Sequence, residues 1–330
     1  MDGNVADRSA RSDEAAATIH RFEFDVPWPP GHVAAYLIED DEPILVDAAI
    51  HGDSAAEHLE DLLADIDFSL EDIAHVLVTH PHTDHIGLVS NVHSAGATIH
   101  APEPVLDQLD RDEDSLVEGV GTVAKEVGYE GDDVEKAVEQ SRYSLQRNRM
   151  LLDPAVAEAV DVFGEFTVGD RTFEPIHTPD IRSITTPSRR RGGRPDLFSG
   201  DALIEPFRAG IIHVGIDHGA FEALEAFHLA MDRLEGREIA RVYPGHGPIF
   251  DNYDEIIDTT RGKLDKLANK TEAAVEAVEP ATPIEITEER FGEILYPGNP
   301  IRYRGGSRLA RDEGRVTHEK RDGVRNYRID

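Results

Sequence analysis

The chain has 330 residues, no cysteine, and 66 acidic against 33 basic side chains, a formal net charge of −33 at pH 7. Without cysteine there are no disulfides and no thiolate metal ligands, so any metal site must use His, Asp or Glu. So acidic a surface repels nucleic acid and anionic membranes at ordinary salt. It is typical of a hydrated, halophilic surface suited to high salt, and points to a salt-loving archaeon.

The first 18 residues are polar and acidic, with no apolar core segment. They are read as a disordered tail rather than a signal peptide or a membrane anchor. Nothing later in the chain is predicted to span a membrane, so we expect a cytoplasmic protein. A chain of this length can bury one sizeable core and carry a small second module.

Hydrophobic period and turn residues predict alternating strands and helices in the first 250 residues. Acid-rich helical stretches over 106–150 are read as an insertion. The expected elements, in chain order, are strands 33–38 and 44–46, a helix over 54–66 capped by Ser54, strand 75–78, a helix over 85–95, strand 98–100, the insertion, a hairpin of 166–168 with 172–176, and a helix over 221–234.

The pattern changes after Gly247. A long helix is predicted over 253–278, followed by a break at 279–283 and a second helix over 282–291. Residues 314–320 and 324–327 then form a predicted hairpin across 321–323.

The segment Thr79-His80-Pro81-His82-Thr83-Asp84-His85 directly follows the apolar strand 75–78. Its imidazole nitrogens and carboxylate oxygens are the ligands that zinc and similar divalent ions use. Such an ion needs three or four ligands, so this segment alone can begin two sites. Three further polar residues follow short apolar runs: Asp47 after 43–46, Asp201 after 197–200, and His246 within 243–247.

Together these segments resemble the signature of the metallo-β-lactamase-fold hydrolases, and the resemblance spans about residues 20–250. It implies an α/β fold, a four-layer αββα sandwich with metals at one edge of its two sheets. The expected division is a tail over 1–18, a hydrolase domain over 19–251 and a small α+β module over 252–330. The latter resembles the winged-helix-like tail of some hydrolases of this fold, although a packing module or a dimer contact is the favoured interpretation.

The resemblance also implies a dinuclear site. His80 and His82 would hold one metal, Asp84, His85 and His246 the other, and Asp201 would bridge the two, while Asp47 would brace the loop. Zinc is the expected metal, with iron or manganese as alternatives. Two such cations lower the pKa of a shared water and present hydroxide as a nucleophile, which Asp84 would orient.

One ligand of the family pattern is missing. Where the family has Thr-Pro-Gly-His, this chain reads His177-Thr178-Pro179-Asp180-Ile181. The first site is therefore weakened, or His177 or Asp180 substitutes, or the reading frame has slipped locally. One extra base upstream would turn Asp180-Ile181 into Gly-His, and a slip would also explain the arginine-rich stretch 182–194. His218 is a candidate substrate contact because it follows Asp201.

Three functions fit these motifs. The favoured one is hydrolysis of a small acyl, thioester or ester substrate, as in the glyoxalase II-like branch. A phosphodiesterase or ribonuclease is the second, and a weakened member kept for binding is the third. A small-molecule substrate is the expected partner, nucleic acid is disfavoured, and a homo-oligomer stays open.

Overall fold

The structure is a computed structural model that describes residues 18–169, 171–178, 194–207, 217, 224–292 and 316–330, together with the backbone of 183–188 and 223. Asp180, Ile181, His213 and His218, and the arginines between 189 and 193, lie outside these residues. Within the described part of the chain, no helix is long and apolar enough to cross a membrane.

The first sheet has the strand order β1-β2-β3-β4-β5-β6. Strands β1, β2 and β3 pair antiparallel, whereas β3 to β6 are parallel. The predicted strands over 33–38, 44–46, 75–78 and 98–100 are all present in it. The strand bounds are β1 Ile19–Asp25, β2 His32–Ile38, β3 Ile44–Val46, β4 His75–Leu77, β5 Thr98–Pro102 and β6 Glu158–Val160.

The second sheet has the order β12-β11-β10-β8-β7, with β9 paired to β10. Its pairs are antiparallel except for β11 with β12, which is parallel. The predicted hairpin is present, but β8 ends at Phe173 and a separate strand follows. The bounds are β7 Phe166–Val168, β8 Arg171–Phe173, β9 Ile176–Thr178, β10 Ser183–Ser188, β11 Asp196–Gly200 and β12 Arg241–Pro244.

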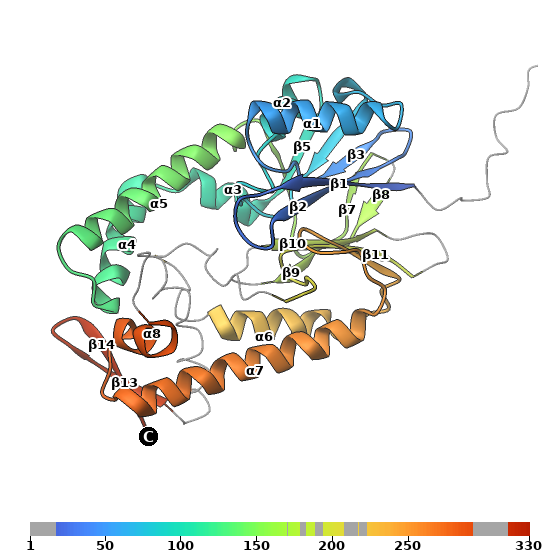
Figure 1. Ribbon diagram of the computed structural model, residues 1–330. Helices are drawn as coiled ribbons and strands as arrows, with labels where there is room; N and C mark the ends of the chain where they lie inside the picture. The colour runs from blue at the N-terminus through green and yellow to red at the C-terminus, as the bar shows by residue number, and fades with distance from the viewer. Residues whose placement is uncertain are drawn as a thin grey trace, which may run out of the picture.

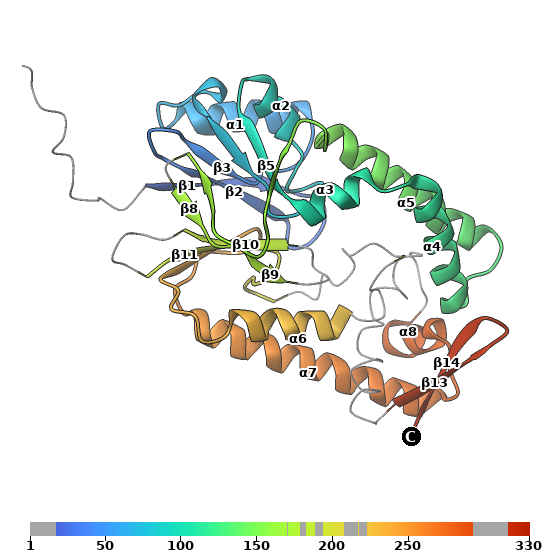
Figure 2. The same cartoon turned by 180° about the vertical axis from the view of Figure 1, so that it is seen from behind.

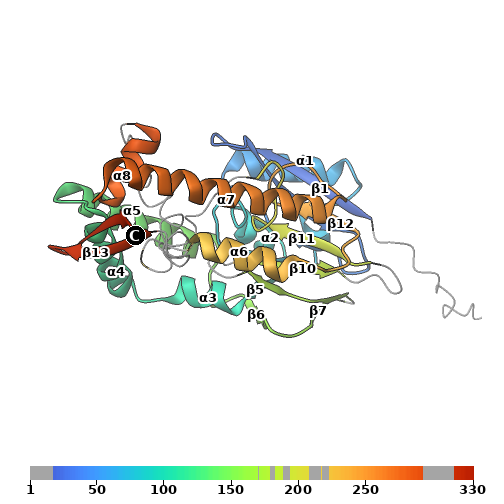
Figure 3. The ribbon, with the colours of Figure 1, turned by 90° about the horizontal axis from the view of Figure 1, so that it is seen from below.

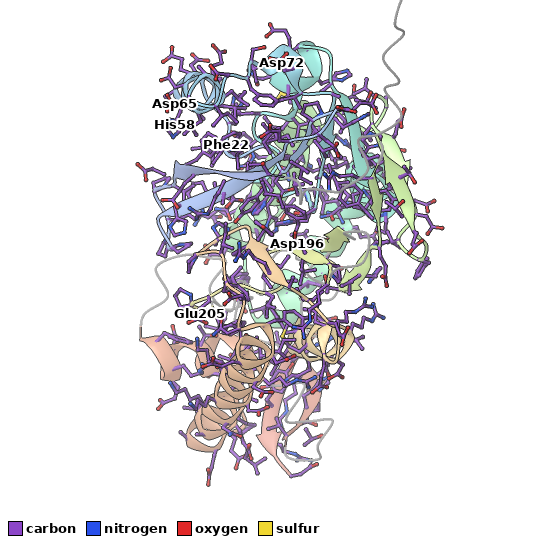
Figure 4. All side chains as sticks on the ribbon, turned by 90° about the vertical axis from the view of Figure 1, so that its right-hand side faces the viewer. Phe22, His58, Asp65, Asp72, Asp196 and Glu205 are labelled. Atoms are coloured by element: carbon purple, nitrogen blue, oxygen red, sulfur yellow. The ribbon has the colours of Figure 1, made fainter. Side chains whose placement is uncertain are left out.

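The predicted αββα sandwich is present: two sheets lie between two layers of helices, and an apolar core fills each of the three spaces between layers (Figure 1). Strand β2 serves two of them, since Val33, Ala35 and Leu37 face the helices while alternate residues face the other sheet. The outer layers are α1 (Asp53–Ala64) with α2 (Val89–Ser94), and α6 (Ala223–Leu234) with the first half of α7. In Figure 4, Phe22 lies in the core between the first sheet and its helices, and Asp196 lies in the second sheet below it.

Two predicted helix starts were wrong. Helix α1 begins at Asp53 with Gly52, not Ser54, at the N-cap, because Gly52 has a φ of 139° that favours glycine. Helix α2 begins only at Val89 rather than at His85. The N–H groups of Gly87 and Leu88 donate to the carbonyl oxygens of Ala49 and Ala48, so this stretch follows the neighbouring segment instead of helical geometry.

The helical insertion consists of α3 (Glu103–Asp110), α4 (Glu113–Val127) and α5 (Asp132–Leu151). Figure 2 shows α4 and α5 extending from the sandwich toward the C-terminal hairpin. Helices α4 and α5 pack on a small apolar core of their own. The insertion is therefore a helical arm that joins the sandwich at one end and approaches the end of the chain at the other.

The C-terminal elements follow the predicted pattern: α7 (Tyr253–Val278), α8 (Pro283–Phe291) and the hairpin β13 (Val316–Arg321) with β14 (Val324–Ile329). Seen from below (Figure 3), α7 runs beside α6 and on to the hairpin. Its first half packs beneath the second sheet, and its last turns pack with α8 and the hairpin. One helix thus serves both the sandwich and the C-terminal module.

Candidate metal centre

Four chain segments that leave parallel strands bring the candidate side chains together. Asp47 follows β3, the histidine loop (residues 79–85) follows β4, Asp201 follows β11, and His246 lies two residues after β12. Strands β3 and β4 are parallel neighbours, as are β11 and β12, so their carboxyl ends lie at one edge of each sheet. Sites in α/β proteins form at such edges.

Asp201 lies at the centre of the cluster. Its Oδ2 is 3.4 Å from His80 Nε2 and 3.4 Å from His82 Nδ1, and its Oδ1 is 3.2 Å from His85 Nε2 and 3.4 Å from His246 Nε2. Each carboxylate oxygen therefore faces two imidazole nitrogens. On one side, His80 Nε2 and His82 Nδ1 are 2.7 Å apart. On the other, Asp84 Oδ2 is 3.5 Å from His246 Nε2.

The cluster divides into two groups, each with three ligand atoms close enough for one metal ion. His80, His82 and Asp201 form one group, and Asp84, His85 and His246 form the other. Asp47 forms a third combination with His80 and His85, but its carboxylate is already engaged in hydrogen bonds. The first two groups are the two sets of side chains expected from the family resemblance, with Asp201 between them.

Asp47 orients the histidine loop from behind. Its carboxylate accepts hydrogen bonds from Thr79 N at 2.8 Å, Thr79 Oγ1 at 2.9 Å and His85 Nδ1 at 2.8 Å. Because Nδ1 of His85 donates to Asp47, its Nε2 points into the cluster. The Thr79 hydroxyl, which donates to Asp47, accepts from His80 Nδ1 at 2.9 Å, so His80 also presents Nε2 inward.

His246 is oriented by a residue that the sequence analysis did not single out. Its Nδ1 donates to the carbonyl oxygen of His32 at 2.7 Å, and Gly247 N donates to His32 Nε2 at 2.9 Å. The Nε2 lone pair of His246 therefore also faces the cluster. His32 is the first residue of β2, and no sequence signal separated it from the other histidines outside the motifs.

Burial and neighbouring charges set the protonation of the cluster. Burial, with the nearby His85 and His82, lowers the pKa of His80 to about 4, so its Nε2 lone pair is available at neutral pH. For His85, burial opposes the charged form, but Asp201 and Asp47 outweigh it and raise the pKa well above its usual value. Burial also opposes ionisation of Asp201, yet His85 and His80 hold its pKa well below the usual range.

Two glycines leave room for these side chains. A Cβ on Gly245 would lie 2.4 Å from His85 Cε1 and 3.2 Å from Asp201 Oδ1. Gly200 has a φ of +50°, and a Cβ there would lie 3.0 Å from Thr79 Oγ1. A side chain at either position would displace the cluster. The 2.4 Å contact at Gly245 is shorter than real Cβ atoms show, and the positive φ of Gly200 favours glycine.

The donor set fits divalent metal ions. His85 Nε2 and Asp201 Oδ1 are buried and make no hydrogen bond within the described part of the chain, although they face each other at 3.2 Å. Buried polar atoms of this kind are costly unless a ligand satisfies them. Imidazole nitrogens and carboxylate oxygens that converge in this way are the ligands that zinc, iron or manganese binds.

His177 is not brought into this cluster. It lies in β9 between the buried Ile176 and Thr178, so its side chain leaves the opposite face of the strand. Its Nδ1 is 3.0 Å from Arg233 Nη1, and its ring stacks on Phe163. Burial and Arg233 lower the pKa of His177. The structure thus gives no support to His177 as a substitute ligand, and Asp180 and His218 lie beyond the described residues.

Comparisons with known proteins show the family of this chain. A model of the metallo-β-lactamase superfamily matches residues 28–246. The probable metallo-hydrolase YqjP of Bacillus subtilis (strain 168) is 25% identical over 282 residues, 81% of this chain and 83% of that protein. A beta-lactamase-like protein 2 homolog of Caenorhabditis elegans is 24% identical over 186 residues, 56% of this chain and 46% of that protein.

Solved structures show the same fold. The metallo-beta-lactamase family protein TTHA1429 from Thermus thermophilus superposes with a TM-score of 0.75 at 20% identity, covering 94% of this chain and 98% of that one. A beta-lactamase domain protein from Burkholderia ambifaria gives a TM-score of 0.73 at 19% identity, covering 96% and 94%. These coverages extend past the sandwich to the insertion and the C-terminal elements.

Proposed function

The chain belongs to the metallo-β-lactamase superfamily and is a metallo-hydrolase, and we propose that it hydrolyses a small acyl substrate, a thioester or a related ester. The observation that carries the proposal is the convergence of imidazole nitrogens on the two oxygens of Asp201. In this proposal two divalent metals, zinc in the first instance, are held by His80, His82, Asp84, His85, Asp201 and His246.

Each side chain has a defined part. His80 and His82 would hold the first metal, Asp84, His85 and His246 the second, and Asp201 both. Two divalent cations supply Lewis acidity and lower the pKa of water toward neutrality, which provides hydroxide for hydrolysis. Asp47 and Thr79 keep His85 and His80 in the tautomers that present Nε2 inward.

Asp84 is the proposed catalytic residue. Burial opposes its ionisation, but His85 and His82 outweigh burial and lower its pKa, so the carboxylate is ionised at neutral pH. An ionised carboxylate accepts a hydrogen bond from the attacking water and fixes its orientation toward the acyl carbon. Since a Ser or Cys nucleophile is not required, no covalent intermediate on the protein is needed.

The surroundings favour an acyl substrate over nucleic acid. Nucleic acid binding needs a positive track that neutralises several phosphates. In the described hairpin, Lys320 and Arg325 both pair with Glu126 of α4, and Arg321 pairs with Glu319. Lys320 and Arg325 therefore hold the C-terminal module against the insertion, which supports a packing role for the module.

Activity profiling at high salt tests the proposal. The metal-loaded protein is assayed against thioester, ester, lactone, phosphodiester and RNA substrates, with Asp84→Ala as the blank. Thioester or ester turnover that Asp84→Ala abolishes is the expected result. Metal-dependent RNA or phosphodiester cleavage exceeding any acyl hydrolysis would overturn the choice of substrate class.

Metal content tests the site separately from the substrate. Elemental analysis of protein purified without chelator is expected to give one to two equivalents of transition metal, because the site offers six ligands in two groups. A metal content below about half an equivalent, unchanged when Asp84 and His246 become alanine, would contradict the proposed metal centre itself.

A further inference from the structure

The C-terminal end of helix α5 contacts the histidine loop. Asn148 Nδ2 donates a hydrogen bond of 2.7 Å to the carbonyl oxygen of Pro81, the residue between His80 and His82. This contact joins the helical insertion to the backbone beside the candidate metal centre. Asn148, in the last turn of α5, therefore borders that centre although it lies 67 positions from Pro81 in sequence.

Arg147 extends this contact. Its Nε and Nη2 both lie 3.4 Å from Asn148 Oδ1, so the amide of Asn148 stands between the guanidinium and Pro81. Its Cζ lies 5.6 Å from the centroid of the Tyr143 ring, one helical turn away, and Tyr143 is 62% exposed. Asn148 and Tyr143 thus hold the guanidinium in place from two sides, and its Nη1 makes no hydrogen bond to any residue that the structure describes.

Arg147 has no ion-pair partner among the described residues, in a chain with twice as many acids as bases. Other arginines of the insertion are engaged. Arg111 pairs with Asp217 at 2.8 Å, Arg142 pairs with Glu113 at 2.8 Å, and Arg149 donates to the carbonyl oxygens of Leu109 and Arg111. Within the part of the chain that the structure describes, Arg147 is therefore the arginine of this helix whose charge has no acidic or carbonyl partner.

We propose that Arg147 recognises an oxyanion, a carboxylate or a phosphate, on the substrate of the adjacent metal centre; this rests on the proposed acyl hydrolysis. Guanidinium groups bind such groups through two parallel N–H donors. The Nε edge faces Asn148, so the Nη1 end is the one that receives the anion. Because an amide separates Arg147 from the histidine loop, the recognised group lies away from the scissile bond.

Three thioesters of one acyl group test this proposal: glutathione carries carboxylates, coenzyme A carries phosphates, and N-acetylcysteamine is neutral. We expect Arg147→Gln to lower the ratio of kcat/KM for one anionic thioester over the neutral one at least about tenfold, or about 1.4 kcal/mol. Arg147→Lys should restore part of the ratio, because a point charge replaces the fork. Which anionic thioester responds identifies the oxyanion.

Arg142→Gln is the matched control, since Arg142 lies on the same helix and pairs with Glu113. This variant should keep the ratio of the wild type. A ratio unchanged in Arg147→Gln, or lowered as much in Arg142→Gln, would overturn the proposal. The assays need the lowest salt at which the protein stays folded, because salt screens the interaction.

Binding separates this proposal from the proposed function. If the wild type hydrolyses none of the thioesters, acyl hydrolysis fails, and calorimetry with S-methylglutathione and S-methyl-coenzyme A then decides the role of Arg147. Weaker binding of one of them to Arg147→Gln than to Arg142→Gln would support oxyanion recognition. Equal binding, or none to any of the proteins, would refute it.

Discussion

At the scale of single residues, the candidate metal centre depends on side chains that do not face it. Asp47 accepts three hydrogen bonds and thereby fixes the orientation of His85 and, through Thr79, of His80. Its backbone has a φ of 58°, a left-handed conformation that Asp and Asn tolerate better than most residues. The position therefore combines a required carboxylate with a constrained backbone.

Replacing Asp47 by Asn should weaken metal binding about 10- to 100-fold, because an amide nitrogen replaces one of the accepting oxygens. The fold should persist, since Asn has the same shape and tolerates the same φ. A competitive zinc titration against a chromophoric chelator measures the change. The control is Asp41→Asn in the exposed turn before β3, and equal zinc affinity of the two variants would contradict the role given to Asp47.

Gly245→Ala should displace His85 and abolish most metal binding and turnover, because its Cβ would lie 2.4 Å from His85 Cε1. Gly262→Ala is the control, as nothing lies within 4 Å of a Cβ at that position of α7. Helix propensity should make the control more stable by about 0.5–1 kcal/mol. If elemental analysis finds the wild-type metal content in Gly245→Ala, the loop accommodates the methyl group and the prediction is wrong.

Ile181 stands where the family pattern has a histidine, which would leave the first metal site with His80, His82 and the shared Asp201. If this residue is genuine, the pair of changes Asp180→Gly and Ile181→His should raise both metal content and activity, because an imidazole replaces water in the metal shell. Resequencing codons 178–196 comes first, since a recovered Gly-His would remove the premise. An intact frame with no gain from the double change would contradict the weakened-site interpretation.

At the scale of elements, Glu126 joins α4 to the C-terminal hairpin. Its carboxylate binds Lys320 and, at 2.8 Å, Arg325, while Gly128 lies against Ile284 and Val324. Burial opposes ionisation of Glu126, but the two cations outweigh burial and lower its pKa below the ordinary 4.5. The insertion is thus held at one end by the hairpin and at the other by Asn148 and Pro81.

Glu126→Gln should therefore lower the free energy of unfolding by about 1.5–3 kcal/mol at neutral pH. The contribution of a carboxyl with a lowered folded-state pKa is fully present above the unfolded pKa and is lost as the pH falls through the folded one. Urea unfolding at constant salt should show the difference at pH 7 and its decline as the pH falls below the ordinary 4.5. Glu130→Gln, at an exposed position, is the control. If the difference in the free energy of unfolding between wild type and Glu126→Gln persists at acid pH, the ion pair is not its cause.

At the scale of the whole molecule, a net charge of −33 opposes the compact state by self-repulsion. Salt shortens the range of that repulsion to a few ångströms at about 1 M. The thermal unfolding midpoint should therefore rise as KCl increases from 0.2 M to 2 M. A midpoint that stays level or falls over this range would contradict the halophilic interpretation of the composition.

Much of the fold could be predicted because local pattern and burial agree. The apolar runs that become β2, β3, β4 and β5 are short and buried, so their period identified them, and α7 was predicted over the range that it occupies. The candidate ligands could be predicted for a related reason. They follow the ends of predicted strands, and they are residue types that bind metals. Both features can be recognised in the sequence.

Only the tertiary structure decided which side chains serve the ligands. His32 contacts His246 from a strand start, and Asn148 contacts Pro81 from a helix end; the partners are 214 and 67 positions away in sequence. The late start of α2 has the same origin, because the N–H groups of Gly87 and Leu88 bond to the segment after β3. The order of residue types in the sequence indicates the chemistry of the site. Hydrogen bonds between distant segments form only once the two sheets have packed, so the sequence alone does not show them.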